Sequence, residues 1–381
     1  MVTFFLLARS SRNANVRRHG LVDVPRYPGH GYALLADRIK RLLETSADVV
    51  FVQAEAVLAL EAVAVSIARH GLVAVNVVTS PYGRWFGNWL RRGGATVHDV
   101  VAAMGQPVDS SAVARCLEML EHVDIVAAVH AESSNGALNP LAELAALAKS
   151  RNALFAVDAV ASIGGHVIDV DGLGIDIAVI GPQKALAGPA GVSAVVLGQR
   201  AWDHVAALPD FAPSSLSLAA LKRDWLDCGR PALPGTPSAM EFWALEAAID
   251  RIEAEGMERV IGRHQQASRA TRSALRALGV LPWIAHDDAA SAIVTSAPVP
   301  RGVDGRELIA QAQRYGAELG PGVGDVARHI VRLNHTGMNA NADSVRSNVV
   351  AFGRALEQLR FVVDLEAARR AVAHAYERCA G

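Results

Sequence analysis

Hydrophobic runs of strand length alternate with helical patterns between about residues 48 and 200. The strand candidates are short and apolar at nearly every position, as in Val73–Thr79, which reads VAVNVVT. Between them, apolar residues recur at helical spacing over Ala56–Ala68, Trp85–Arg92 and Leu141–Ser150. Near-continuous apolar strands separated by helices are typical of a mostly parallel sheet covered on both faces. The pattern therefore predicts an α/β fold with strands at Val49–Gln53, Val73–Thr79, Thr96–Val101, Ile125–His130, Ala153–Asp158, Ile175–Gly181 and Val192–Leu197.

The pattern changes after about residue 205. Prolines cluster between residues 209 and 237, and a long helix is predicted from Ser238 to Glu255. Residues 258–381 predict the order helix, strand, helix, strand, helix, which indicates a smaller α/β domain. We predict an N-terminal arm and helix over residues 1–45, a large domain over residues 46–250 and a small C-terminal domain over residues 251–381.

Composition and charge exclude several classes of protein. The 37 Lys and Arg residues balance 38 Asp and Glu residues, so the chain lacks the basic excess that binds nucleic acid or acidic membranes. The apolar runs are far shorter than the roughly 18 residues that span a bilayer, and Val2–Leu7 is too short for a signal peptide. The widely spaced Cys116, Cys228 and Cys379 favour neither a disulfide framework nor a zinc site. We therefore expect a cytoplasmic protein without a metal.

Unusual polar residues follow three of the predicted strands, in the segments His130–Gly136 (HAESSNG), Asp158–Gly165 (DAVASIGG) and Gly181–Lys184 (GPQK). Ligands of parallel sheets bind beyond the carboxyl ends of the strands. A buried lysine there has a lowered pKa and serves as a Schiff-base nucleophile. A buried aspartate needs a cation, and a protonated pyridine nitrogen would be one. The sequence therefore indicates Lys184 and Asp158 as a reactive pair.

These segments resemble the class V aminotransferase family, which are fold type I pyridoxal phosphate enzymes such as alanine–glyoxylate aminotransferase. The resemblance covers most of the chain and implies a large mostly parallel sheet domain, a small C-terminal α/β domain and a homodimer. It implies pyridoxal 5'-phosphate as the cofactor and Lys184 as the Schiff-base lysine that also moves the proton. Asp158 would hold the pyridine nitrogen protonated, and Arg332 would bind the carboxylate of the substrate.

The resemblance also implies further contacts with the cofactor. Val160 would pack on one face of the ring, and an aromatic residue on the other face, with Trp85 preferred over Tyr82 and Phe86. Ser133 would lie on the hydroxyl side of the ring. The remaining expected contacts are Ala56, Gln183 and, lent to the phosphate by the partner subunit, Thr236.

The turn that binds the phosphate departs from the family pattern. The family has a Gly-Ser-Gly-like turn that opens a helix, and helix N-termini bind anions. Here the turn reads Gln53-Ala54-Glu55-Ala56. Two unit charges about 4 Å apart repel by about 4 kcal/mol at an effective dielectric near 20, and a phosphate dianion doubles that. We therefore expect Glu55 to disfavour a phosphate.

Within the family, the turn and the segments Pro81–Trp89, Arg314–Gly316 and Arg332–Gly337 are similar to pyridoxamine–pyruvate aminotransferases. Enzymes of that group use unphosphorylated pyridoxal and pyridoxamine as substrates. The resemblance predicts an aminotransferase that transfers the amino group between free pyridoxamine or pyridoxal and a 2-oxo acid such as pyruvate.

Alternatives stay open at this point. If Glu55 only capped its helix, it would not disfavour a phosphate. The protein would then be a pyridoxal phosphate-dependent aminotransferase of the alanine/serine–glyoxylate/pyruvate type. Further alternatives are another lyase-type use of the lysine and a non-catalytic dimer that binds B6 vitamers. The second arginine of the pyridoxamine–pyruvate group is replaced by Val323, so Arg9 and Arg328 are candidates for a second carboxylate contact. The amino donor and the keto acid stay open.

Overall fold

The computed structural model describes residues 24–207, 214, 216–317 and 319–377. Of the helices in these ranges, none combines the length and apolarity that crossing a membrane requires. The larger sheet has seven strands in the order β1-β7-β6-β5-β4-β2-β3. In chain order they are β1 (Asp48–Val52), β2 (Val73–Val78), β3 (Thr96–Val101), β4 (Ile125–Val129), β5 (Leu154–Asp158), β6 (Ile177–Ile180) and β7 (Ser193–Leu197).

Most neighbours in this sheet run parallel. β3, β2, β4, β5 and β6 pair in parallel, whereas β7 is antiparallel to both β6 and β1. Except for the edge strand β3, the strands are buried at nearly every position, because helices cover both faces of the sheet. The predicted α/β fold with a mostly parallel sheet is confirmed.

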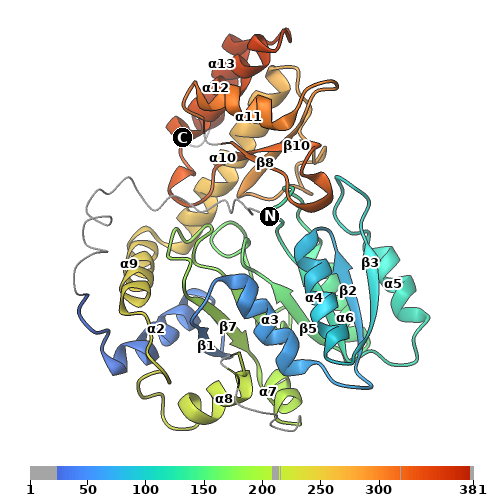
Figure 1. Ribbon diagram of the computed structural model, residues 1–381, viewed down its shortest axis with the longest axis vertical. Coiled ribbons are helices and arrows are strands. Elements are labelled where there is room, and N and C mark those ends of the chain that lie inside the picture. Colours follow the sequence, from blue (N-terminus) through green and yellow to red (C-terminus); the bar gives the residue numbers. More distant parts are fainter. Residues whose placement is uncertain (1–23, 208–213, 215, 318, 378–381) are drawn as a thin grey trace.

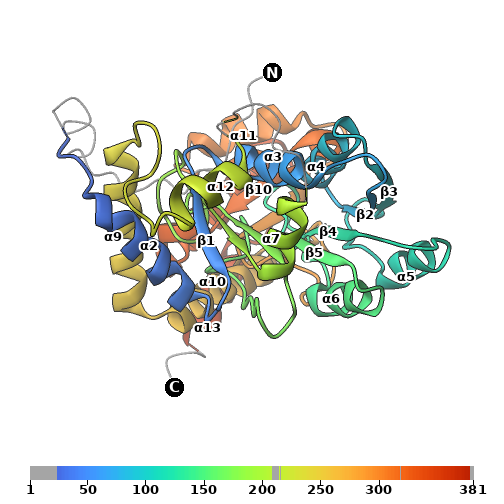
Figure 2. The same cartoon turned by 90° about the horizontal axis from the view of Figure 1, so that it is seen from below.

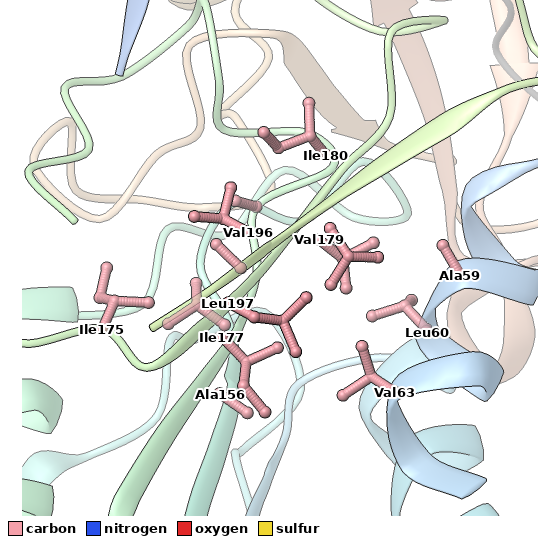
Figure 3. Packing of buried hydrophobic residues seen from close by; sticks show 14 of the residues in the cluster. Ala59, Leu60, Val63, Ala156, Ile175, Ile177, Val179, Ile180, Val196 and Leu197 are labelled. Atoms are coloured by element: carbon pink, nitrogen blue, oxygen red, sulfur yellow. The ribbon is translucent and has the colours of Figure 1, made fainter. Parts of the chain in front are cut away.

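Helices on the two faces come from the segments between the strands. Figure 2 shows α3 (Ala56–Ile67) and α4 (Pro81–Arg92) on one face and α6 (Leu141–Ser150) on the other. The other helices that the structure describes in the large part are α2 (Gly29–Leu42), α5 (Ser110–Glu118), α7 (Gln199–Ala206), α8 (Leu218–Leu221), the π-helical turn η1 (Lys222–Leu226) and α9 (Ala239–Glu255). The core lies between the sheet and these helices, and Figure 3 shows Leu60 and Val63 of α3 opposite Ile177 and Val179 of the sheet.

α4 begins earlier than the sequence pattern predicted. The hydroxyl of Ser80 accepts a hydrogen bond from the Tyr82 N–H at 3.1 Å, and Pro81 occupies the first turn. Serine caps and prolines in the first turn both favour helix starts. The predicted helix over Trp85–Arg92 therefore extends back to Pro81, which places the aromatic residues on defined faces of the helix.

The C-terminal part has its own sheet and core. It consists of α10 (Met257–Ala277), β8 (Val294–Pro298), α11 (Gly305–Gln313), β9 (Leu319–Pro321), η2 (Gly324–Val326), β10 (Ile330–Asn334), η3 (Gly337–Asn339), α12 (Ala342–Gln358) and α13 (Leu365–Glu377). Its three strands form an antiparallel sheet in the order β8-β10-β9, above the large sheet in Figure 1. The expected order of elements missed β9, because a three-residue strand with a glycine and a proline has no strand pattern. The predicted domain boundaries stay predictions.

Candidate active site

A pocket of about 330 Å³ lies at the carboxyl edge of the large sheet. The register of β4, β5 and β6 puts Val129, Asp158 and Val179 level with one another, so the segments after these strands meet at one edge. The N-terminal turns of α3 and α4 close the pocket from the side. Its walls are Glu55, Ala56, Val57, Leu60, Tyr82, Val129, Ala131, Glu132, Ser133, Asp158, Val160, Ala161 and Lys184.

Lys184 is buried in the turn that follows β6. Lys184 is only 4% exposed. The Ala187 N–H donates to the Lys184 carbonyl at 3.0 Å, and Arg251 of α9 donates to the carbonyls of Leu186 and Ala187. Burial, with a smaller contribution from the charge of Arg332, lowers the pKa of Lys184 to about 8. The amine is therefore uncharged far more often than a surface lysine.

Asp158 ends β5 and faces the same pocket as Lys184. One carboxylate oxygen accepts the Val160 N–H at 2.9 Å. The residues after Asp158 form turns rather than a helix, so this contact is local and not a helix cap. Burial raises the pKa of Asp158 to about 7, and the Val160 N–H only partly opposes that rise. A carboxyl group in this position is stabilised by a cation in the pocket.

Tyr82, rather than Trp85, forms the aromatic wall. Tyr82 lines the pocket, and burial raises its pKa to about 12. Trp85 packs edge-on against Tyr82, with ring centroids 5.5 Å apart, and is not among the residues of the pocket wall. Both residues lie on the same side of α4, but Tyr82 is in the first turn and lines the pocket, whereas Trp85 is one turn further along the helix, so the geometry favours Tyr82 over Trp85. A Cβ at Gly83 would lie 2.6 Å from the Val77 carbonyl, so glycine permits this close approach of α4 to β2.

Glu55 occupies the N-terminus of α3. One carboxylate oxygen accepts the Val57 N–H at 3.0 Å, and the other accepts the Gln183 side-chain N–H at 2.9 Å. Gln183 is buried and holds the carboxylate from the side of Lys184. Glu55 therefore both caps its helix and lines the pocket, at the place where a helix N-terminus would bind an anion.

Arg332 reaches the site from β10 in the small sheet and is 2% exposed. Its Nε donates to the Pro321 carbonyl at 2.7 Å, and its Nη1 donates to the Ser133 carbonyl at 2.5 Å. Its Nη2 is buried without a hydrogen-bond partner. Burial lowers the pKa of Arg332 to about 10, which leaves it charged at neutral pH. Two of its groups are thus fixed, and the third is available for a carboxylate.

Other predicted residues lie outside the pocket wall. Thr236 is exposed in the link before α9, and Arg328 is exposed in the β9–β10 connection, which also holds Val323. Arg9 lies outside the described residues. Gln183 is also outside the pocket wall, and its side-chain amide donates a hydrogen bond to Glu55.

For Glu132, the sequence left structural hydrogen bonding and a place in the site as equal alternatives. It is completely buried, lines the pocket and accepts hydrogen bonds from the hydroxyls of Thr79 and Ser134 at 2.6 and 3.0 Å. Burial raises its pKa, whereas these hydroxyls and that of Ser80 lower it. Its place in the polar segment after β4 was the only signal available, because its partner Thr79 follows β2 and is 53 residues away in the sequence.

Comparison with known proteins identifies the family of the chain. The profile of the family described as aminotransferase class-V matches residues 9–336. Pyridoxamine–pyruvate transaminase of Mesorhizobium japonicum is 30% identical over 352 residues, which cover 88% of this chain and 89% of that protein. Alanine–glyoxylate aminotransferase of Drosophila melanogaster is 27% identical over 290 residues, or 75% and 73% of the two chains.

A solved structure gives the same answer for the fold. The crystal structure of pyridoxamine–pyruvate aminotransferase from Mesorhizobium loti matches with a TM-score of 0.89 at 28% identity, covering 95% of this chain and 93% of that one. The fold implies pyridoxal phosphate as the cofactor of the family. The chain is therefore an aminotransferase with the fold type I architecture, and it belongs to the class V aminotransferase family.

Proposed function

We propose that this aminotransferase takes unphosphorylated pyridoxamine and pyridoxal as substrates and exchanges the amino group with a 2-oxo acid. The observation that carries the proposal is the carboxylate of Glu55 at the N-terminus of α3. The 30% identity to a pyridoxamine–pyruvate transaminase supports the same reaction.

The residues fit a pyridine aldehyde but not its phosphate. Lys184 and Asp158 offer an amine and an acid in one pocket, and Tyr82 and Val160 offer two walls for a ring. At the other end, the Val57 N–H and the Gln183 amide, which would serve an anion, are both bound to Glu55. A phosphate dianion about 4 Å from this carboxylate would be repelled by roughly 8 kcal/mol at an effective dielectric near 20. A hydroxymethyl group is neutral and donates a hydrogen bond, so it suits Glu55.

Each residue has a defined task in this proposal. A bound pyridine aldehyde supplies an electron sink for the amino-acid carbon. Lys184 Nζ would condense with the aldehyde with loss of water, and an incoming amine would displace it. The freed Nζ would then accept a proton from one carbon and return it to the other, the amino-acid carbon and the aldehyde carbon being joined through the nitrogen. Asp158 holds the proton on the ring nitrogen, and Tyr82 and Val160 orient the ring. Arg332 binds the carboxylate of the 2-oxo acid through Nη2, while Ser133 holds Nη1 through its carbonyl.

The low pKa of Lys184 predicts a specific pH dependence. Condensation needs the uncharged amine, so the rate of band formation with pyridoxal should rise about tenfold per pH unit below pH 8 and level off above it. For a lysine at its ordinary value of 10.5 the rise would continue through pH 10. Stopped-flow absorbance between pH 6 and 10 measures this profile, and a rise that continues to pH 10 would contradict the buried site.

We also propose a homodimer formed on the outer face of α3. α3 is apolar on nearly all sides, and Leu58 and Val65 are 41% and 46% exposed. Thr236 is exposed. It lies close to the start of this helix, since the Gln53 amide donates a hydrogen bond to the nearby Pro234 carbonyl at 3.2 Å. In this arrangement Thr236 would face the pocket of a second copy.

Sedimentation velocity tests the dimer. We expect twice the chain mass, and we expect Leu58→Asp to shift the protein toward the monomer because it buries a charge in the interface. Met119→Asp is the matched control, since Met119 is exposed on α5's C-terminal end and away from α3. A monomeric wild-type protein would rule out the arrangement.

The alternative, an amino-acid aminotransferase that retains pyridoxal phosphate, requires Glu55 to leave two hydrogen bonds. Incubation with pyridoxamine and pyruvate distinguishes the two. Our proposal expects pyridoxal and alanine to form in equal amounts, and turnover with pyridoxamine phosphate to be at least about 100-fold slower. Faster turnover of the phosphorylated amine would overturn it.

A further inference from the structure

A second cavity adjoins the first next to Asp158. It lies between α3, α4 and the face of the large sheet. Leu60, Tyr82, Val129 and Asp158 line both cavities, so the second is a continuation of the first beneath the two helices.

The strand register explains why space remains there. Asn76 of β2, Ala127 of β4, Ala156 of β5 and Ile177 of β6 are register partners and form one row across the sheet. Asp158 lies two residues beyond Ala156, so it is on the same face. Two adjacent members of the row, Ala127 and Ala156, are alanines, and their small side chains leave space above the sheet next to Asp158.

The helices do not fill the space above these alanines. α3 packs on β6 and β7, whereas α4 packs on β2, β3 and β4, so the seam between them runs over β5. Figure 3 shows Leu60 and Val63 of α3 reaching toward Ile177 and Val179, with Ala156 below them. The cavity thus lies at the seam between the two helices.

The walls of the second cavity are almost entirely apolar. The residues with polar side-chain atoms in its wall are Asp158, Asn76 and Tyr82. The Asn76 amide is already bound to the Gly83 carbonyl at 3.0 Å and to Asp99 at 2.8 Å. A cavity with so few free polar groups holds water poorly and favours an apolar occupant.

We propose that this cavity binds an alkyl group attached to the ring carbon next to the pyridine nitrogen, and that it accepts a chain longer than methyl. The inference rests on the proposed function, in which Asp158 pairs with the ring nitrogen. The ring atoms nearest to Asp158 are then the carbons beside that nitrogen, and pyridoxal carries its methyl group on one of them. The ligand class is therefore 2-alkylpyridine aldehydes and the corresponding amines.

Absorbance titration of the wild-type protein tests the proposal directly. The two ligands are pyridoxal and its homologue with an ethyl group in place of the methyl. We expect the homologue to bind at least as tightly, and up to about fourfold more tightly, since one more methylene is buried. A homologue that binds more than about tenfold more weakly would overturn the inference. A wild-type protein that forms no band with pyridoxal itself would overturn the proposed function, and the inference with it.

A second experiment fills the cavity by substitution. Ala156→Val should weaken binding of the ethyl homologue at least about tenfold more than binding of pyridoxal, because the added methyl groups occupy the same space. Ala178→Val is the matched control, since Ala178 pairs with Val157 and so lies on the opposite face of the sheet. Equal weakening of both ligands by Ala156→Val would contradict the proposal. Thermal melts check folding, and Ala127→Val, in the same row, replaces Ala156→Val if that variant does not fold.

Discussion

Lys184→Ala should form no visible absorbance band with pyridoxal at any concentration, and transamination should fall by at least about 1,000-fold. The lysine supplies the amine that condenses with the aldehyde and the base that moves the proton, and loss of a positioned base alone accounts for about 10²–10⁴-fold. Arg332, whose positive charge contributes to the lowered pKa of Lys184, cannot replace it, because a guanidinium stays protonated. Absorbance titration and a coupled assay of the keto acid measure both effects.

Removing Lys184 should not unfold the protein. Folding lowers the pKa of this amine, so the buried charge opposes folding at neutral pH. We expect a melting temperature within a few degrees of the wild type. Lys149→Ala, at an exposed position near the end of α6, is the matched control and should keep the full band. A band that persists in Lys184→Ala would show that another amine carries the chemistry.

Glu55→Ser should raise the affinity for pyridoxal phosphate relative to pyridoxal by about 100-fold or more. The substitution removes a carboxylate that repels a phosphate by several kcal/mol, and about 1.4 kcal/mol corresponds to a factor of ten in binding. It also frees the Gln183 amide, which donates to Glu55 in the wild type. Serine keeps the helix cap, so the fold should be unaffected. Parallel titrations with the two aldehydes give the ratio.

Two further variants separate charge from bulk. Glu55→Gln removes the charge and keeps the volume, so it should raise the ratio in the same direction if repulsion is the cause. Glu143→Ser removes a charge from an exposed position of α6, on the other face of the large sheet, and should leave the ratio unchanged. An unchanged ratio in Glu55→Ser would mean that the carboxylate does not decide which vitamer binds.

The sequence was sufficient for the sheet and for the position of its polar residues. Strands such as Ile125–Val129 are apolar throughout, because both faces are covered, and this pattern identifies them locally. Asp158 and Lys184 could be predicted to lie near each other, since the carboxyl ends of β5 and β6 meet at one edge. Their chemical roles remain predictions.

Features that join distant segments were beyond the sequence. The bond between Glu55 and Gln183 links residues 128 positions apart, and that between Arg332 and Ser133 links residues 199 positions apart. The choice of Tyr82 over Trp85 depended on the first residue of α4, which a helical pattern locates only to within a few residues. The space above Ala127 and Ala156 beside Asp158 depends on the register of β4 and β5, which the sequence of either strand alone does not reveal.

The central claim is that the vitamin is a substrate and its phosphate is not a resident cofactor. The most direct test is a visible absorbance titration of the dialysed protein with pyridoxal and with pyridoxal phosphate in parallel. Our proposal predicts a band that saturates with pyridoxal, and a band with the phosphate that is weak or lost on dialysis. A protein that is yellow as purified and retains pyridoxal phosphate through dialysis would contradict the claim and show that Glu55 does not exclude the phosphate.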